Sequence, residues 1–598
     1  MNIDQISEWP SEIGGGYWFD QNGICFYRTV GVDKNGAVTD ETSEPIANFT
    51  PILKEQRRID NGIEVNEVLV FQAYRAGHLW EEVSTNTKGI VGQTPQAVFG
   101  AGCRVYIGKL KVARLREIMQ IQCETAPRTT IYQHTGYAII NGKRVFLNGG
   151  YSVTAEGMTD RFNVVFEGQL SNYRFTNERH AGRYKTLLEG LPAVAPFPLV
   201  YAGLGLVFLT PLNALLRDEG MEPRFILYFV GKTGTRKSTI ANLFLNFFGM
   251  YEYNTSPPAS YRDTINALEK KQAVLDSTLC VIDDKFPPTT ARDRAQLDSI
   301  DQHEARAIGD RSARGRMNAD GSLRVTYRPK CNLIATAEEA FTNVGESAVA
   351  RALSVELKPG DIDLDALTEV QANAVHLNEC MGEYIQFVLQ NWDSLKTELK
   401  PLFMELRRKA QTGAHGRLSE CVAHLQIGIT VMCKWLLSIG QIDEKQAEEI
   451  KIRAWSVFVK LSEEQNRRIT EEKPVKLFID AMREMIDRGA IRFVDITGDY
   501  SDYSSEKKMG YKDEDFYYCY PDTIYTAVRR FYSDQDKNFP LGKVAIFQQL
   551  AIDGLIEVDK AQTTKAKRIG NKRPRFLWLK ASTIEREGET DNEHEREE

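Results

Sequence analysis

RFILYFVGKTGTRKSTIANLFLNFFG, residues 224–249, decides the fold of this chain. Residues 225–230 form an unbroken apolar run, which is typical of a parallel strand buried on both faces. From Gly231 to Ser238 the spacing is that of a phosphate-binding loop, in which backbone N–H groups and a helix start surround a polyphosphate. The stretch therefore predicts strand, loop and helix in the order that a nucleotide site requires.

The loop carries the predicted ATP-binding residues. They are Gly231, Gly234, Thr235, Arg236, Lys237, Ser238 and Thr239. We expect Lys237 to reach the β and γ phosphates and the hydroxyl of Ser238 to bind Mg²⁺. Arg236 stands where such loops usually have glycine, so the loop must be strained there or built differently. The alternative is a plain glycine turn with an incidental Lys-Ser pair.

Two further apolar runs end in side chains suited to the same site. LCVIDD, residues 279–284, ends in Asp283, a candidate Mg²⁺ ligand, and Asp284, a candidate for orienting the attacking water. Asp284 is shorter than the glutamate usual at this place, which would slow hydrolysis or require a displaced water. CNLIAT, residues 331–336, ends in Thr336, which we expect to hold the nucleophilic water. Paired acids after a strand are also common at protein surfaces.

Two arginines are candidate contacts to the γ-phosphate. Arg351 follows a short predicted helix and opens a strand, where it could stabilise transition-state charge across a subunit boundary. An ordinary ion pair explains it equally well. Arg417, at a predicted helix start, is a candidate second phosphate sensor, with a plain surface arginine as the alternative.

The composition is that of an ordinary soluble globular protein with several domains. A chain of 598 residues is too long for one core, and its net charge of −7 argues against a uniformly basic nucleic-acid coat while leaving room for a local basic site. Nine cysteines without a C-x-x-C pair or a His-Cys cluster predict neither a zinc site nor disulfides, and they fit a reducing cytoplasm. The apolar stretch 199–216 contains Pro211 and Asn213, so a core helix explains it better than a membrane span.

Two basic segments are candidate DNA contacts. One is a hairpin around the turn Asp320-Gly321, with Arg314, Arg316 and Arg324. The other is a loop between two strands near the C-terminus, with Lys565, Lys567, Arg568, Lys572 and Arg573. Clustered cations suit sequence-independent contacts to phosphates. The alternatives are a solvated loop for the hairpin and a protein-docking surface for the second segment.

The pattern of elements predicts an α/β protein with separate domains. We expect a β-rich N-terminal domain (1–190), a P-loop ATPase core (191–360), a helical lid (361–472), a winged helix-turn-helix (473–583) and an acidic, disordered tail (584–598). The proline-rich segment LPAVAPFP, residues 191–198, marks the first boundary.

With these motifs in place, the sequence resembles the helicase-like ATPases of bacterial mobile elements. These form a phage and genomic-island family known through a domain of unknown function, distantly similar to the minichromosome-maintenance-like helicases of staphylococcal cassettes. The resemblance covers most of the chain and is carried by HTGYAIINGKRVFLNGG, GKTGTRKST, VIDDKFPP, RAIGDRSARGRM, IATAEE and ESAVAR. It implies an AAA+ ring, expected to be a hexamer, with ATP between subunits, the basic hairpin facing a central channel and Arg351 acting in trans.

These observations predict an ATP-driven DNA helicase or translocase that replicates a mobile genetic element, with ATP and Mg²⁺ as cofactors. The alternative from another class is an origin-binding or regulatory protein that uses ATP as an assembly switch and does not unwind DNA. A third hypothesis is a nucleotide-dependent defence protein with no DNA track. The partners expected are single-stranded, forked or origin DNA and further copies of the chain, in the cytoplasm and away from membranes.

Overall fold

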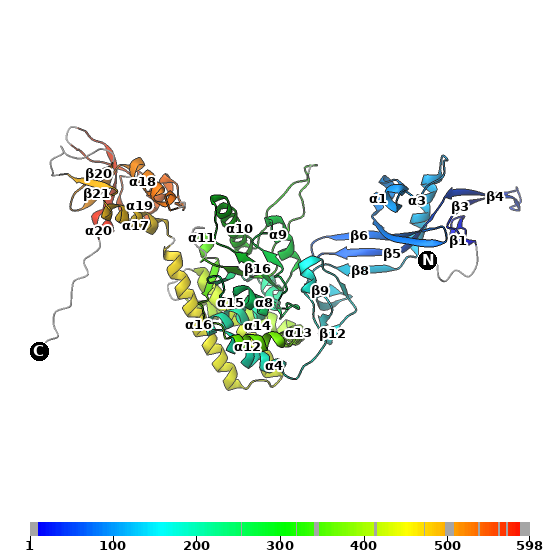
Figure 1. Ribbon diagram of the computed structural model, residues 1–598, viewed down its shortest axis with the longest axis horizontal. Helices are drawn as coiled ribbons and strands as arrows, with labels where there is room; N and C mark the ends of the chain where they lie inside the picture. Colours follow the sequence, from blue (N-terminus) through cyan, green and yellow to red (C-terminus); the bar gives the residue numbers. More distant parts are fainter. Residues whose placement is uncertain are drawn as a thin grey trace.

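Three parts follow one another along the molecule: an N-terminal arm, a central unit and a C-terminal unit (Figure 1). The computed structural model describes residues 10–252, 254–318, 320–339, 346–411, 416–471, 473–496, 507–535, 537, 539–559, 562–569 and 572–585. Most of the predicted acidic tail, 586–598, lies outside this range.

The central unit is built on a parallel sheet. Its strands are β14 (Ile226–Val230), β15 (Ala259–Ser260), β16 (Leu279–Lys285), β17 (Asn332–Ala337) and β18 (Ala352–Glu356). Their order is β15-β16-β17-β14-β18, and each neighbouring pair is parallel. β14 is buried along its whole length, as its unbroken apolar run predicts. Because all strands run the same way, the residues that follow β14, β16 and β17 meet at one edge.

Helices cover both faces of this sheet. Those between or directly before the strands of the sheet are α8 (Lys237–Leu245), α9 (Ile265–Val274), α10 (Ala291–Asp310) and α11 (Glu346–Val349). The remainder form a bundle of α4 (Arg183–Lys185), α5 (Leu191–Val194), α6 (Phe197–Leu209), α7 (Asn213–Asp218), α12 (Leu364–Ala372), α13 (Val375–Gln390), α14 (Trp392–Lys409), α15 (Gly416–Ser438) and α16 (Glu444–Glu471).

The bundle and the sheet share one hydrophobic core, so the predicted division at 360 does not separate two cores. The helix α6 lies between them, with α15 on one side and β14 on the other. The approach of α6 and α15 is so close that a Cβ on Gly428 would lie 2.1 Å from the carbonyl oxygen of Gly205. Glycine at this contact lets the two backbones touch.

The core also extends N-terminal to the predicted boundary at 190. A small sheet, β9 (Gly136–Ile140), β10 (Lys143–Leu147), β11 (Ser152–Thr154) and β12 (Gly157–Thr159), contributes Phe146 and Val153 to it. The segment LPAVAPFP is largely helical, because Pro192 lies inside the continuous helical run 183–194 and Pro198 lies in the first turn of α6. Proline is well tolerated in a first turn, since the N–H group there has no partner within the helix.

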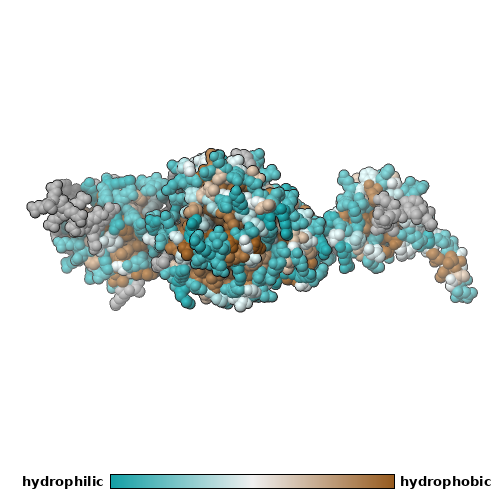
Figure 2. Space-filling view, turned by 90° about the horizontal axis from the view of Figure 1, so that it is seen from below, coloured by the Kyte–Doolittle hydropathy of each residue, from teal (hydrophilic) through white to brown (hydrophobic). Residues whose placement is uncertain are grey.

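The N-terminal arm is rich in antiparallel pairs, as its short strand-like runs predict. Its sheets are β1-β2-β3-β4 and β13-β8-β5-β6-β7. Their elements are β1 (Ser11–Gly14), β2 (Tyr17–Phe19), β3 (Cys25–Val32), β4 (Val38–Ala47), β5 (Thr50–Asp60), β6 (Val65–Arg75), β7 (His78–Thr85), β8 (Arg128–Tyr132) and β13 (Asn163–Val164), with α1 (Thr87–Gly92), α2 (Pro95–Phe99) and α3 (Lys111–Ile121). At the far end of the arm the β3–β4 hairpin exposes Val30, Val32 and Val38, and apolar residues are visible at that end of the molecule (Figure 2).

The C-terminal unit packs helices on one face of a mixed sheet of order β19-β20-β21-β24-β22. Its helices are α17 (Pro474–Asp487), α18 (Pro521–Ser533), α19 (Lys543–Ile552) and α20 (Ala581–Ile584), and its strands are β19 (Arg492–Asp495), β20 (Lys508–Lys512), β21 (Phe516–Cys519), β22 (Ile556–Glu557), β23 (Lys565–Ala566) and β24 (Arg575–Lys580). The segment expected to form a winged helix-turn-helix thus contains the helices α17, α18 and α19 and the strand pair β22–β24. The β20–β21 hairpin between the first two helices enlarges the sheet beyond the prediction.

Two helical stretches, Phe197–Asp218 and Gly416–Ser438, are long and apolar enough to cross a membrane. The most apolar windows of these stretches are 94% and 78% buried inside the protein. Such burial is that of core helices, as expected for residues 199–216.

Candidate nucleotide site

A cavity of about 390 Å³ lies at the edge of the central sheet where β14, β16 and β17 end. It is lined by Thr233, Gly234, Arg236, Lys237, Ser238, Thr239, Asp284, Lys285, Thr336 and Glu338. Residues from three separate stretches of the sequence thus converge on one hollow. Its volume lies within the range of small-molecule sites in proteins.

The loop before α8 depends on two glycines. A Cβ on Gly231 would lie 2.5 Å from the carbonyl oxygen of Leu357, so only glycine fits there. Gly234 has a φ of 87°, a conformation that side chains rarely adopt. Thr235 is buried, and its hydroxyl donates to the carbonyl oxygen of Lys232 at 2.8 Å, which closes the loop on itself.

Arg236 adopts the conformation of the glycine that it replaces. Its φ is 63° and its ψ 28°, in the left-handed region, at the residue that caps α8. The loop is therefore strained at Arg236 rather than rebuilt.

Lys237 opens α8 and faces several carboxylates. Its Nζ donates to the carbonyl oxygen of Lys232 at 3.1 Å. Burial lowers the pKa of the Lys237 ammonium, while the charges of Glu338, Asp283 and Asp284 oppose that shift. This ammonium group stands at the start of a helix, where an anion is also favoured by the helix dipole.

Thr336 joins the ends of β16 and β17. Its hydroxyl donates to Oδ1 of Asp283 at 2.5 Å and accepts from the backbone N–H of Asp284 at 3.0 Å. Asp284 lies in the left-handed region with a φ of 67°, which turns its side chain out of the strand direction. The guanidinium of Arg262 contacts Oδ2 of Asp284 at 3.2 Å.

Three site residues were not predicted from the sequence. Glu338 lines the cavity and accepts a hydrogen bond of 2.5 Å from the hydroxyl of Thr233. The sequence signal that could have identified Glu338 is its position directly after the predicted strand that carries Thr336. Lys285 also lines the cavity and forms an ion pair with the buried Asp301. Arg262 lies two residues beyond β15, in a stretch without a motif, and contacts Asp284.

These residues fit a magnesium nucleotide by the chemistry of their donors. The hydroxyl of Ser238 and the carboxylates of Asp283 and Asp284 are oxygen ligands of the kind that Mg²⁺ prefers. The loop amides, the start of α8 and the ammonium of Lys237 suit a polyphosphate. Asp283 does not line the cavity directly, because its carboxylate is turned to Thr336.

Arg351 and Arg417 do not join this cavity. The carbonyl oxygen of Arg351 accepts from the N–H of Ile226, so Arg351 lies at the start of β14, at the opposite end from the loop. Both arginines approach Asp310, at 2.7 Å from Arg351 and 3.9 Å from Arg417. Arg351 also lines a separate cavity of about 630 Å³, which α17 and α19 of the C-terminal unit help to form.

The predicted hairpin arginines differ in how they are held. Arg314 and Arg316 both pair with Glu269, a buried carboxylate on α9, and the Nε of Arg314 lies 3.0 Å from it. Arg324 is exposed, and its side chain donates from Nε to the side-chain oxygen of the nearby Asn318 at 3.0 Å. Two of the three cations therefore fix the base of the hairpin, and one is presented outward.

The C-terminal cations divide in the same way. Lys565 pairs with Glu557 at 3.1 Å, and Lys567 pairs with Asp513 at 3.3 Å. Both lysines also lie over aromatic rings, Lys565 over Trp578 at 4.4 Å. The exposed cations of this surface are Arg568, Lys572 and Arg573.

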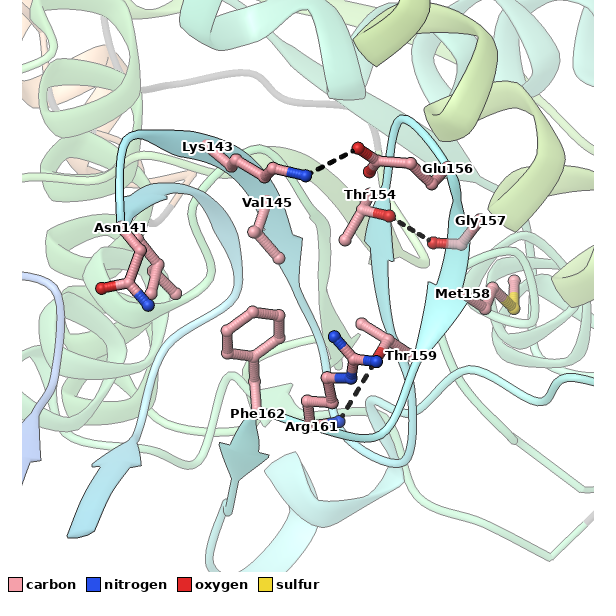
Figure 3. A pocket seen from close by; sticks show the side chains of 11 residues that line it. Asn141, Lys143, Val145, Thr154, Glu156, Gly157, Met158, Thr159, Arg161 and Phe162 are labelled. Carbon is pink, nitrogen blue, oxygen red and sulfur yellow. Dashed lines mark hydrogen bonds and ion pairs between the residues drawn. The ribbon is translucent and has the colours of Figure 1, made fainter.

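A larger cavity, of about 720 Å³, lies on the β9–β12 sheet and away from the predicted residues (Figure 3). Lys143 and Glu156 form an ion pair of 3.0 Å at its rim, and Arg161 and Phe162 point into the same hollow. No candidate nucleotide or DNA residue lines it.

No family model matches the chain, and no curated protein matches it either. Its structure is similar to that of SCCmec type IV Cch, described as an active helicase, with a TM-score of 0.59 and 12% identity over 96% of this chain and 99% of that one. This likeness shows a shared fold. The NrS-1 C-terminal region (TM-score 0.27, 10% identity, 87% of this chain and 95% of that one) and JCV helicase (TM-score 0.19, 13%, 38% and 70%) overlap too loosely to add to it.

Proposed function

We propose that this protein is an ATP-driven motor that moves along DNA and unwinds it during replication of a mobile genetic element. The observation that carries the proposal is the cavity of about 390 Å³, in which the loop lysine Lys237, the acid Asp284 and the hydroxyl of Thr336 converge. Together these supply the polyphosphate, metal and water contacts that phosphoryl transfer needs. The fold shared with a protein described as an active helicase supports it.

The roles follow from the chemistry of each group. Lys237 and the loop amides hold the β and γ phosphates, and Ser238 and Asp283 hold Mg²⁺, which neutralises charge on the phosphates when bound. Asp284 accepts a proton from the attacking water, and Thr336 positions that water.

A ring accounts for the two distant arginines. Arg351 and Arg417 lie at the opposite end of β14 from the loop of their own chain, so they cannot reach its phosphates. We infer that they face the nucleotide of a neighbouring subunit in an AAA+ type hexamer, where an arginine stabilises transition-state charge. The pairing with Asp310 would then be exchanged for the γ-phosphate on assembly.

DNA contacts in this proposal come from the exposed cations. Arg324 on the hairpin would face the channel, and Arg568, Lys572 and Arg573 would contact duplex beside α19, in the manner of a winged helix. Arg314, Arg316, Lys565 and Lys567 would act by holding these loops in place.

The test is unwinding of a forked duplex with and without Mg²⁺ and ATP, alongside the mass of the assembled complex. Lys237→Ala is expected to abolish ATP hydrolysis and unwinding while leaving most DNA binding. Lys270→Ala, an exposed lysine on α9, is the matched control and should behave as wild type. Unwinding that survives in Lys237→Ala would refute the motor.

One observation favours a second candidate, an ATP-switched origin-binding protein without unwinding activity. Asp284 is short, and one of its carboxylate oxygens, Oδ2, is already engaged by the guanidinium of Arg262 at 3.2 Å. A switch would bind ATP and DNA, yet its ATP turnover would not rise with DNA. Measuring turnover with and without single-stranded DNA separates the two candidates.

A further inference from the structure

A second group of metal-ligating side chains lies where the extended segment 176–180 crosses α13, and none of them lines the nucleotide cavity. Glu178 and His180 are two residues apart in the extended segment, so they share one side of it. His376 and Glu379 are three residues apart on α13, so they share one face of the helix. The fold therefore brings together two pairs of residues about 200 positions apart in the sequence, as the 199-residue separation of His180 and Glu379 shows.

The ligand atoms are close to one another. One atom each of Glu178, His180 and Glu379 lies within 4.8 Å of the others. Nδ1 of His180 is 2.5 Å from Oε1 of Glu379, and the backbone N–H of His180 donates to Oε2 at 2.8 Å. The ring of His376 adjoins them, with its centroid 5.1 Å from that of His180.

The buried carboxylate of Glu379 is held by His180, whose ring Nδ1 and backbone N–H both contact it. The Glu379 side chain is 1% exposed, and among the described residues the only ion-pair partner recorded for it is His180. Arg183, three residues beyond the segment, is engaged with Glu383 at 3.0 Å, and no ion pair is recorded for Arg179 within the segment among the described residues. Burying a carboxylate is costly unless it is paired or coordinates a metal. Glu178 and His180 are exposed, which leaves a path from solvent to the buried carboxylate.

The surroundings hold these side chains in place. The hydroxyl of Thr186 lies 2.8 Å from Nδ1 of His376, the kind of second contact that orients a metal-binding histidine. Asn378 pins the segment to the helix, because it accepts from the N–H of Thr176 at 3.0 Å and donates to the carbonyl oxygen of Arg174 at 3.1 Å.

We propose that Glu178, His180 and Glu379, with His376 beside them, bind one divalent transition-metal ion, for which Zn²⁺ is the best fit. Imidazole and carboxylate are ligands of Zn²⁺ at 2.0–2.2 Å, and Mg²⁺ disfavours the nitrogen. On binding, the imidazole of His180 is neutral and any proton on it passes to solvent. The imidazole of His180 and the carboxylate of Glu379 then coordinate the ion instead of contacting each other. The ion fastens the segment that leads out of the β9–β12 region onto α13.

The experiment is a titration of the full-length protein with Co²⁺, which reports tetrahedral nitrogen and oxygen ligands by its visible absorption. Millimolar Mg²⁺ is present throughout to keep Co²⁺ from the nucleotide site. We expect one equivalent to bind per chain and to be displaced by Zn²⁺. His180→Ala and Glu379→Gln should each weaken binding at least tenfold, by analogy with the loss of a metal ligand.

His78→Ala is the matched control, because His78 is exposed on the N-terminal arm. It should leave the titration unchanged. His180→Ala removes a half-exposed side chain, so we expect the variant to fold like wild type. Circular dichroism checks this. The proposal is overturned if wild type develops no Co²⁺ absorption, or if its absorption is the same in both site variants.

Discussion

Arg236→Gly tests whether the phosphate loop stores backbone strain. Arg236 is exposed, makes no capping hydrogen bond with its side chain, and has a φ of 63°. The left-handed conformation destabilises a residue that has a Cβ by roughly 1–2 kcal/mol. Glycine avoids that strain but gains freedom in the unfolded chain, which offsets about 0.5–1 kcal/mol. The expected result is a protein more stable by about 0.5–1 kcal/mol.

The assay is urea unfolding of the full chain, monitored by fluorescence, for wild type, Arg236→Gly and Arg236→Ala. The transition in which the central unit unfolds is compared among the three proteins. Alanine removes the same side chain but keeps the Cβ, so its stability should stay near that of wild type. The affinity for magnesium ATP should change less than about threefold in both variants, because the loop is expected to hold the phosphates through backbone N–H groups, which both variants keep. Equal stabilisation by glycine and alanine would refute the strain argument.

Three further predictions concern the central unit. Gly428→Ala places a Cβ 2.1 Å from the carbonyl oxygen of Gly205, so we expect a loss of roughly 3 kcal/mol or more in urea unfolding, while Gly416→Ala, with open space around it, should stay within about 0.5 kcal/mol. Burial raises the pKa of Glu304 to about 7, so the folded state keeps a proton that the unfolded chain loses near its ordinary value. The contribution of Glu304 to the unfolding free energy should therefore fall by about 3 kcal/mol as pH rises from 4.5 to 7, so the difference in unfolding free energy between wild type and Glu304→Gln should change by that amount over this range; parallel pH profiles of the two proteins would contradict this. Thr336→Val should lower ATP turnover about a hundredfold with little change in KM, and Thr336→Ser should restore most of it; equal turnover in Thr336→Val and wild type would remove its proposed role.

The site was predictable from the sequence where its signals are local. The loop and the ends of β16 and β17 carry apolar runs followed at once by polar side chains, so Lys237, Asp284 and Thr336 could be placed at one edge of a sheet. Glu338 and Arg262 were missed, because their contacts are made through the fold and not through neighbours in sequence.

The division into domains was less predictable. Pro192 and Pro198 suggested a joint, yet both lie in helical segments, and proline is well suited to a first helical turn such as that of Pro198 in α6. The roles of the hairpin cations were also hidden, because the partner of Arg314 and Arg316 is Glu269 on another helix. An ion pair between distant residues leaves no pattern along the chain.

The glycine contact between α6 and α15 has a mechanical consequence. Backbones that touch at Gly205 and Gly428 leave no room for sliding, so sheet and bundle respond to force as a single block. In the ring proposed above, energy released at one nucleotide would not be lost in bending that block. It would turn one whole subunit against the next, with the N-terminal arm and the C-terminal unit carried along as levers.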